Sequence, residues 1–425
     1  MRRGFLKNEY AKTVTAKPPT APPQTKAKQT KKTVVKVPSE SLHNAEDDAP
    51  IKLAMPEGDI ASLNLNLVTL PMPNFLRPEP MSICLIWPIQ KQKILALPGF
   101  PVRFVPPPRV LYEIKPIPGA GMGMVATQDI EVGDLIVRER PLIIMVQGIP
   151  YDKRHPEYAR IQTEMPITAL SEENRSAFYA LHNCKGDKAP FPAAGIIDTN
   201  AIGIGALPGF ENDCAAVCKD ISRCNHSCSP NAVYHWHLQS FSEELRAIRP
   251  IAKGEEIVIT YTPLRCPHRE RQASLEQSYG FKCTCRICSL PAEESRRSDA
   301  RRRLLVIAST KNKSGDDTEL KAWIKDMNAP DNVIIERCKK MLDLMDQEGW
   351  YDENYWPVYF ERIVKAYLAL GDAENAKTWA EKAAALTIAF TGEDKGWSRV
   401  VAHPQDTEWW NLRTMAHSAE PLSPI

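Results

Sequence analysis

The sequence feature that most constrains this chain is a group of three cysteines within six residues, Cys283, Cys285 and Cys288. A structural zinc ion takes four tetrahedral ligands, and one short loop can supply three of them as thiolates. The fourth ligand must come from elsewhere, and spacing alone does not choose among the candidates, which are Cys214, Cys218, Cys224, Cys228 and Cys266. The alternative, three buried thiols grouped by chance, is disfavoured by so dense a cluster. The sequence therefore predicts a structural zinc site with one ligand unassigned.

The composition is that of a globular protein with more than one domain. The chain has 425 residues, of which 43% are hydrophobic and 25% charged, and its formal net charge is +2. A charge so close to neutral argues against a surface built for nucleic acid, which is therefore not an expected partner. No stretch approaches the roughly 20 apolar residues that cross a bilayer. We expect a soluble protein of the cytoplasm and/or nucleus, where the 11 cysteines are thiols or metal ligands rather than disulfides.

The first 109 residues carry weak folding signals. Residues 1–50 are typical of a disordered basic tail: residues 1–44 contain ten lysines and arginines against two acidic residues, and apolar side chains are too few to offset the entropy of ordering. Residues 51–109 contain apolar patches interrupted by prolines, and we assign them no fold. We expect neither segment to belong to the core, so deletion of residues 1–100 should leave activity largely unaltered.

The rest of the chain divides into three regions. Residues 110–265 combine short strand signals with Gly and Pro, which is typical of an irregular β-rich domain, and carry a helical insert at about 150–200. Residues 266–291 hold the cysteine cluster, and residues 292–425 are helical. Within that last region, two helical segments flank Gly371-Asp372 and resemble one tetratricopeptide unit, although an ordinary helical hairpin explains the pattern equally well. The predicted fold class is α+β.

Three short motifs precede the cysteine cluster. Gly121-Met122-Gly123 lies in a glycine-rich turn between strand signals. Residues 225–231 read Asn-His-Ser-Cys-Ser-Pro-Asn, and residues 254–261 form a turn followed by a strand that ends in Tyr261. By itself, each motif has an ordinary structural explanation, namely a turn, a hydrogen-bonded loop and a core strand. Only their combination and order point to one kind of chemistry.

In this order and with these separations, the motifs resemble SET-domain protein-lysine methyltransferases over about residues 110–290. The chain looks most similar to the SET-MYND group and its fungal relatives, which also share residues 198–202 and a helical C-terminal region. It departs from that group in one respect: between Leu135 and Asn200 the only cysteine is Cys184, so the multi-cysteine MYND module is absent. The resemblance implies an irregular SET domain followed by a zinc-binding tail.

The resemblance also implies a cofactor, a substrate and a set of site residues. The cofactor is S-adenosylmethionine, and the substrate is a lysine of a histone or of another protein. Tyr261 would be the catalytic tyrosine at the bottom of a lysine channel, and Tyr279 would help to wall that channel. The implied zinc ligands are Cys228, Cys283, Cys285 and Cys288. The residues expected at the cofactor are Gly121, Met122, Gly123, Asn200 (placed on a strand), Asn225, His226 and Phe281.

Two other functions compete with this interpretation. A catalytically silent SET-fold scaffold would bind protein partners through the C-terminal helices, but the presence of Tyr261, Asn225 and His226 favours an enzyme. A zinc-dependent nucleic-acid binder would need a basic stripe beside the cysteines, and Lys282 with Arg286 is too little. The sequence therefore favours an active protein-lysine methyltransferase.

Overall fold

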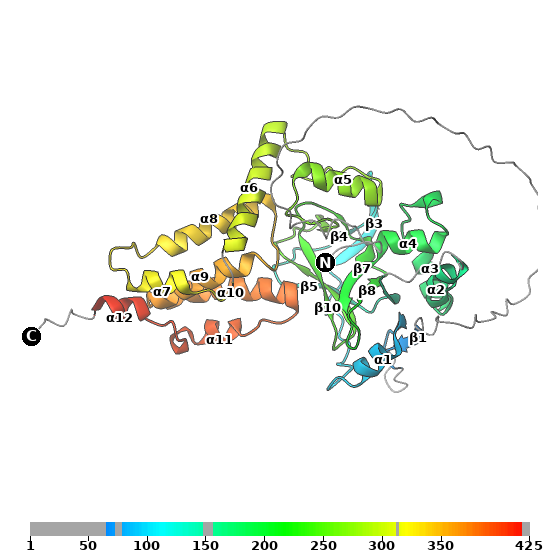
Figure 1. The fold of residues 1–425 in the computed structure, drawn as a ribbon, viewed down its shortest axis with the longest axis horizontal. Helices are drawn as coiled ribbons and strands as arrows, with labels where there is room; N and C mark the ends of the chain where they lie inside the picture. The colour runs from blue at the N-terminus through cyan, green and yellow to red at the C-terminus, as the bar shows by residue number, and fades with distance from the viewer. Residues whose placement is uncertain (1–64, 73–78, 148–155, 312–313, 419–425) are drawn as a thin grey trace, which may run out of the picture. The chain divides into compact units, whose positions relative to one another are not determined.

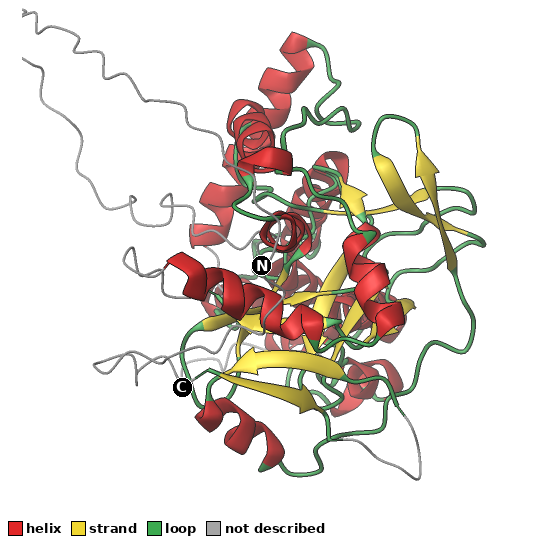
Figure 2. Ribbon diagram, turned by 90° about the vertical axis from the view of Figure 1, so that its right-hand side faces the viewer, coloured by secondary structure: helices red, strands yellow, loops and turns green. Residues whose placement is uncertain are grey.

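The computed structural model describes residues 65–72, 79–147, 156–311 and 314–418 (Figure 1). The predicted basic tail, residues 1–50, lies outside the described residues. Within the described residues the fold is α+β, as predicted, and Figure 2 shows its strands and helices in separate colours. The named strands end at Ile259, and only helices follow from His268 onward. None of the described helices is both long and apolar enough to cross a membrane.

The largest sheet among the described residues has five strands and is buried on both faces. Across the sheet the order is β1 (Asn66–Leu70), β2 (Ser82–Ile86), β6 (Ile143–Val146), β8 (Asp213–Val217) and β7 (Ile202–Ala206). Only β2 and β6 pair in parallel. Ile143 and Met145 pack into one core cluster, whereas Ile144 and Val146 pack into another. Because side chains alternate between the faces of a strand, a strand covered on both faces must be apolar throughout.

Part of the N-terminal segment belongs to this core. Strands β1 and β2 form one side of the five-stranded sheet, and helix α1 (Pro88–Leu95) follows them. Leu70, Ile86 and Ile94 have no solvent-exposed surface. The expectation that residues 1–100 lie outside the core was therefore wrong for their described part. The prolines are compatible with this structure because they fall at its edges: Pro71 follows β1, and Pro88 occupies the first turn of α1, where no backbone N–H is required.

A second sheet brings the three sequence motifs together. Its order is β3 (Tyr112–Ile117), β4 (Gly121–Ala126), β12 (Glu256–Ile259) and β9 (Asn225–His226). Strands β3 and β4 form a hairpin, β12 runs antiparallel to β4, and β9 runs parallel to β12. The glycine motif, Asn225-His226 (the Asn-His segment) and the strand after Glu255 thus become neighbours, although more than 100 residues separate the first from the second.

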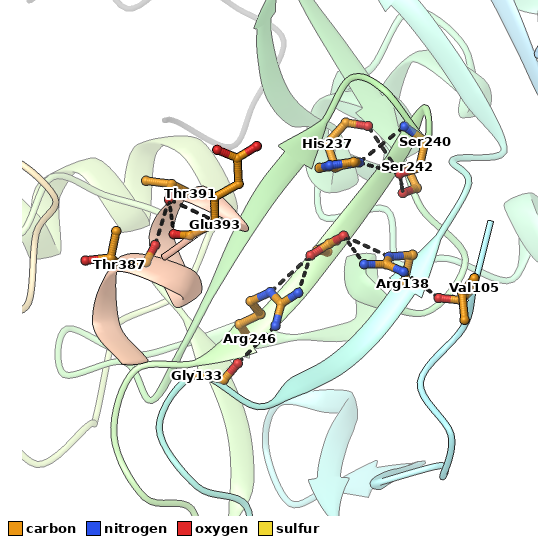
Figure 3. A network of polar contacts seen from close by, with 11 residues as sticks. Val105, Gly133, Arg138, His237, Ser240, Ser242, Arg246, Thr387, Thr391 and Glu393 are labelled. Atoms are coloured by element: carbon orange, nitrogen blue, oxygen red, sulfur yellow. Dashed lines mark hydrogen bonds and ion pairs between the residues drawn. The ribbon is translucent and has the colours of Figure 1, made fainter. Parts of the chain in front are cut away.

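The third sheet contains a buried ion-pair network. It consists of β10 (Ala232–His237), β11 (Ser242–Ala247) and β5 (Leu135–Glu139). The carboxylate of Glu244 on β11 pairs with both Arg138 and Arg246, with N–O distances of 2.6 and 2.7 Å. Figure 3 labels the two arginines of this network. Burial alone would raise the pKa of Glu244, but the two guanidinium groups outweigh burial and lower it. The pairing makes a buried charge tolerable in this sheet.

The predicted helical insert forms three helices, α2 (Pro156–Thr168), α3 (Glu172–Tyr179) and α4 (Pro192–Asn200). Ser171 caps α3, because its hydroxyl accepts a hydrogen bond from the backbone N–H of Asn174 at 3.3 Å. The sequence also carries strand signals at residues 195–204, and this prediction was wrong over its first half, because α4 continues to Asn200 and β7 starts at Ile202. A short apolar run does not distinguish a strand from a buried helix. Gly195 is needed because the side chain of Asn183 packs directly against it.

The C-terminal region is helical, as predicted, and shares a core with the β-rich region. After α5 (His268–Tyr279), the described helices are α6 (Ala292–Lys311), α7 (Thr318–Lys325), α8 (Val333–Glu348), α9 (Trp356–Ala369), α10 (Ala373–Thr391), α11 (Trp397–Ala402) and α12 (Leu412–Ser418). Gly371, at a φ of +73°, and Asp372, which caps α10, separate α9 from α10. Ile248 and Leu264 pack into the same hydrophobic cluster as these helices. The helical region is therefore an integral part of the fold.

Candidate functional site

A cavity of about 1010 Å³ opens where the second sheet meets the segment after α5. Its wall includes eight of the nine residues predicted to be catalytic or to bind the cofactor, which are Gly121, Met122, Asn200, Asn225, His226, Tyr261, Tyr279 and Phe281. The ninth, Gly123, lies directly behind that wall on β4. The structure thus brings residues from five distant parts of the chain to one site. The volume suits a ligand of cofactor size together with a side chain.

The two glycines of the first motif serve different ends. Gly121 has a φ of +73°, a left-handed conformation that glycine adopts without strain. At Gly123, a Cβ would lie 2.5 Å from Ile117, 2.7 Å from Glu256 and 2.9 Å from Asn225. A side chain at this position would displace these three side chains and disturb the hydrogen bond between Asn225 and Glu256. Gly123 therefore leaves room for the side chains that form this part of the cavity wall.

The Asn-His segment is held by side-chain hydrogen bonds. Nδ2 of Asn225 donates to Oε1 of Glu256 at 2.8 Å. Nδ1 of His226 accepts a hydrogen bond from the backbone N–H of Tyr261 at 2.9 Å. The neutral imidazole must then carry its proton on Nε2, which lies 3.2 Å from the sulfur of Cys228. His226 consequently links the cavity to the cysteine cluster.

Aromatic rings form one side of the cavity. The ring centroids of Tyr261 and Tyr279 are 4.9 Å apart, and those of His226 and Phe281 are 6.2 Å apart. Gly280 ends α5 with a φ of +75°, and this left-handed turn lets Tyr279 and Phe281 both face the cavity from either side of the helix end. A wall of this kind excludes water and offers flat faces to a purine base.

Asn200 reaches the cavity from the end of α4 and not from a strand, which corrects the prediction. Its amide nitrogen donates to the carbonyls of His182 and Ile196, each at 2.7 Å, and only 4% of the residue is exposed. The side chain therefore fixes the segment around His182 at the cavity wall. Its own amide N–H groups are already engaged in those two bonds.

The cysteine cluster adjoins this cavity, and two of its members, Cys283 and Cys285, line it. The sulfur atoms of Cys228, Cys283, Cys285 and Cys288 lie within 4.8 Å of one another. Tetrahedral zinc with Zn–S bonds of about 2.3 Å places its sulfurs about 3.8 Å apart, which is close to the spacing of this set. Hydrogen bonds among the four thiols lower the pKa of Cys285 and Cys288 and raise the pKa of Cys228 and Cys283, so the four groups share their protons. Among the described residues this is the one group with the spacing and donors of such a site.

The backbone of the cluster is held by Gln272 of α5. Its Nε2 donates to the carbonyl of Cys283 at 2.8 Å, and its Oε1 accepts from the N–H of the same residue at 2.9 Å. These two bonds hold the backbone of Cys283 at both its N–H and its carbonyl group. The fourth cysteine, left open by spacing, is Cys228, which is fully buried. Donor set, distances and burial fit a structural zinc ion.

Comparison with known proteins agrees with this geometry. Residues 121–262 match the SET domain family. This chain contains a SET domain. It is 35% identical over 197 residues to the histone-lysine N-methyltransferase set5 of Schizosaccharomyces pombe, and the match covers 46% of this chain and 56% of that protein. Over 88 residues it is 33% identical to the N-lysine methyltransferase SMYD2-B of Xenopus laevis, covering 21% of this chain and 20% of the relative.

The SET domain of this chain is thus related to both fungal and SET-MYND proteins, as the sequence predicted. A third relative is a SET domain-containing protein of Dictyostelium discoideum, 41% identical over 71 residues, which covers 17% of this chain and 18% of the relative. The chain spans about half the length of the fungal relative and about a fifth of the two others. The matched part includes the cavity motifs from Gly121 to Tyr261.

The C-terminal helices hold the SET domain at the segment that carries Cys228. Arg302 of α6 donates from Nε to Glu348 of α8 at 3.0 Å, from Nη1 to the carbonyl of Leu264 at 2.6 Å and from Nη2 to the carbonyl of Cys228 at 3.3 Å. Arg302 is 1% exposed, and Glu348 is fully buried. Arg286, within the cysteine cluster, also reaches the end of α8. These contacts join the cavity wall to the helical region.

Arg223 is a residue of the SET domain that sequence reasoning missed. It lines the cavity two positions before Asn225 and is half-buried. Its guanidinium makes no ion pair or hydrogen bond within the described residues; burial lowers its pKa, and the charge of Asp220 opposes that effect. No pattern in the sequence distinguishes this arginine from a surface arginine, because only the fold turns it toward the cavity.

Proposed function

We propose that this protein is an S-adenosylmethionine-dependent protein-lysine N-methyltransferase. The observation that supports this most strongly is the gathering of Gly121, Asn225, His226, Tyr261 and Phe281 around one cavity within a SET domain. The relatives from S. pombe and X. laevis carry names that assign methyl transfer to histone lysine and to lysine, respectively. The substrate proposed here is therefore a lysine side chain of a histone or another protein.

The residues of the cavity suit the needs of such a transfer. S-adenosylmethionine, when bound, supplies an electrophilic methyl group. A lysine amine has a pKa of about 10.4 in water and must lose its proton before its lone pair can attack. The rings of Tyr261 and Tyr279, 4.9 Å apart, provide apolar surroundings that disfavour the ammonium form. The hydroxyl of Tyr261, oriented by the carbonyl of Cys224 at 2.6 Å, lies where it can orient the amine.

Several residues are suited to hold the cofactor. Gly121 leaves backbone open to the ligand, and Asn225 with His226 offers backbone groups at the cavity edge. Phe281 offers a face for the adenine ring. Arg223, which has no ion pair among the described residues, offers a positive charge to the carboxylate at the methionine end.

The cysteine cluster is proposed to bind one structural zinc ion. Cys228 follows the Asn-His segment, whereas Cys283, Cys285 and Cys288 follow Phe281. A zinc ion held by all four would therefore tie together two walls of the cavity. It would take no part in the chemical step, because four thiolates leave no open coordination position.

Two further assignments complete the proposal. The hairpin of α9 and α10 is proposed to be a tetratricopeptide-like unit whose helices offer a surface to protein partners. The cytoplasm and/or nucleus is proposed as the site of action, because none of the 11 cysteines is paired in a disulfide, as is usual in a reducing compartment.

The test is methyl transfer to a proteome extract. The full chain is incubated with extract and methyl-labelled S-adenosylmethionine, and labelled proteins are digested and analysed for methyl-lysine by mass spectrometry. Binding of S-adenosylhomocysteine is measured on the same sample by calorimetry. We expect both labelled lysine and binding. A folded chain that binds the product but labels nothing would contradict the enzymatic proposal and support the scaffold.

A further inference from the structure

Arg271 is a buried arginine with no carboxylate partner in the part of the chain that the structure describes. It lies on α5, and its side chain is fully shielded from solvent. Nη1 donates to the backbone carbonyl of Cys266 at 2.6 Å. Nε and Nη2 are buried and have no partner in hydrogen-bond geometry among the described residues. A buried guanidinium left in this state is costly, so these two N–H groups call for an acceptor.

The guanidinium is directed at the cysteine cluster. Its charge interacts with the thiols of Cys228 and Cys288. Leu275 and Tyr279 follow Arg271 at steps of four residues along α5, so the three share one face of the helix. Leu275 and Tyr279 pack against Cys228 and its neighbours. Arg271 is thus on the face of α5 that supports the cluster and the cavity.

A second buried arginine near the cluster, Arg302, has a carboxylate partner. Arg302 also approaches Cys228 and is buried, but its guanidinium is paired with the buried carboxylate of Glu348. The charge of Arg271 has no such counterpart among the described residues. Two buried arginines therefore flank one cysteine, and only one of them has an acid.

The missing negative charge is one that a loaded cluster would supply. Four thiolates around one Zn²⁺ carry a net charge of about −2. Thiolate sulfurs accept hydrogen bonds, and such bonds to metal ligands fix their orientation and stabilise their charge. The forked geometry of arginine can present two N–H groups to two neighbouring acceptors. Neutral thiols are only weak acceptors and carry no charge that could balance Arg271.

We propose that Arg271 is a positioning residue of the metal site, which donates from Nε and Nη2 to the sulfurs of Cys228 and Cys288 in the zinc-loaded protein and thereby slows loss of the metal. This inference rests on the zinc assignment of the proposed function. It adds a role for a residue that is neither a zinc ligand nor part of the cavity wall.

Zinc transfer to a chromophoric chelator tests the role of Arg271. The zinc-loaded wild type is compared with Arg271→Met, Arg271→Lys and a matched control, Arg413→Met. Arg413 is 1% exposed, donates to backbone carbonyls of the helical region and pairs with Asp331 at 2.7 Å, so its loss measures the general cost of removing a buried arginine away from the cluster. We expect zinc to leave Arg271→Met at least about tenfold faster than the wild type. The rate of zinc loss from Arg271→Lys should lie between these two rates, and the rate from Arg413→Met should stay within about twofold of the wild-type rate.

Cobalt substitution provides a readout that a merely structural role would not move. Hydrogen bonds to thiolates lower the energy of the sulfur lone pairs, so their loss shifts the sulfur-to-cobalt charge-transfer band to longer wavelength. We expect this shift in Arg271→Met and not in Arg413→Met. If Arg271→Met fails to fold, the same two measurements on Arg271→Lys, with Arg413→Lys as the control, test the role of Arg271.

Unchanged zinc transfer and an unchanged band in metal-loaded Arg271 variants would overturn the role of Arg271 alone. A wild-type chain that takes up neither zinc nor cobalt would overturn the zinc assignment and, with it, this inference. The two failures are therefore distinguishable.

Discussion

The hydroxyl of Tyr261 donates a hydrogen bond to the backbone carbonyl of Cys224 at 2.6 Å. Cys224 immediately precedes the Asn-His segment, and Tyr261 follows β12, which pairs in parallel with that segment. The bond therefore fixes the phenol at the junction of two chain segments that line the cavity. A hydroxyl held in this way can act on a substrate without first being ordered.

Tyr261→Phe should reduce methyl transfer by about tenfold or more, because the hydroxyl is proposed to orient the amine. Affinity for S-adenosylhomocysteine should hardly change. The control is Tyr359→Phe, which removes a buried hydroxyl of α9 that has no partner among the described residues. Turnover is measured with labelled cofactor on the best substrate in the extract, and affinity by calorimetry. Wild-type turnover in Tyr261→Phe would remove this residue from the mechanism.

Phe281→Ala should weaken binding of S-adenosylhomocysteine by about 1–3 kcal/mol, the cost of losing an aromatic face and its buried area. Phe281 lines the cavity just before the cysteine cluster. Because the ring is proposed to contact adenine, the loss should be equal for 5′-methylthioadenosine, which retains that base. Calorimetry with both ligands measures the effect, and an unchanged affinity for either one would contradict the assignment.

Arg223→Met should lower the affinity for S-adenosylhomocysteine about tenfold and leave the affinity for 5′-methylthioadenosine nearly unchanged, because only the first ligand carries a carboxylate. The matched control is Arg249→Met. Arg249 also lines the cavity, but it is already paired with Glu255 at 2.9 Å. If Arg223→Met weakens the two ligands equally, the arginine supports the wall and does not bind the carboxylate.

Cys285→Ser should remove zinc and abolish activity without touching any reacting group. Structural zinc sites contribute on the order of 10 kcal/mol to the folding of small modules, so loss of one thiolate should disorder the segment after Phe281. Metal analysis of the purified chain should give about one zinc in the wild type and in Cys266→Ser and Cys214→Ser. A Cys228→Ser variant that keeps its full zinc would show that the fourth ligand is another residue.

Glu139→Gln should make stability less dependent on pH. Burial, followed by the negative charge of Asp220, raises the pKa of Glu139 from 4.5 to about 7. Between these values the folded chain holds a proton that the unfolded chain releases, so stability is full below pH 4.5 and falls as the pH rises toward about 7. Glutamine keeps an oxygen for the N–H of Ile221, which Glu139 accepts at 2.6 Å.

Urea unfolding at pH 5, 6, 7 and 8 measures this effect. The free energy of unfolding should fall less between pH 5 and 7 in Glu139→Gln than in the wild type. The control is Glu131→Gln, an exposed glutamate of the same domain, which should follow the wild type. Parallel pH profiles for Glu139→Gln and the wild type would show that Glu139 does not titrate in this range.

Features set by neighbours in the chain could be predicted from the sequence. Ser171 caps a helix because its hydroxyl is three residues from the N–H that it accepts. Gly371-Asp372 separates two helices because glycine tolerates the left-handed turn and aspartate caps the next helix. The order of the motifs, with Tyr261 and the three clustered cysteines, was enough to indicate a SET domain and its cavity residues. In each case a short segment carries its own conformational or chemical requirement.

Other features were decided by tertiary structure alone. No local sequence signal marks β1 and β2 as part of the core. They belong to it because β6 pairs with β2 and because two apolar clusters cover the sheet. Asn200 lies at the end of a helix, α4, whose last residues are buried; the short apolar run of the sequence did not distinguish this helix from a strand.

The sequence by itself determined which chemical groups are present: three thiols in one loop, a tyrosine after a strand signal and a glycine motif earlier in the chain. Only the tertiary structure decided which distant groups share that chemistry. It placed Cys228 beside Cys283, Cys285 and Cys288, and it buried Arg271 against them without an acid among the described residues. The physical reason is that ligand sets and charge compensation depend on distances in space, and spacing along the chain does not fix these once residues are far apart.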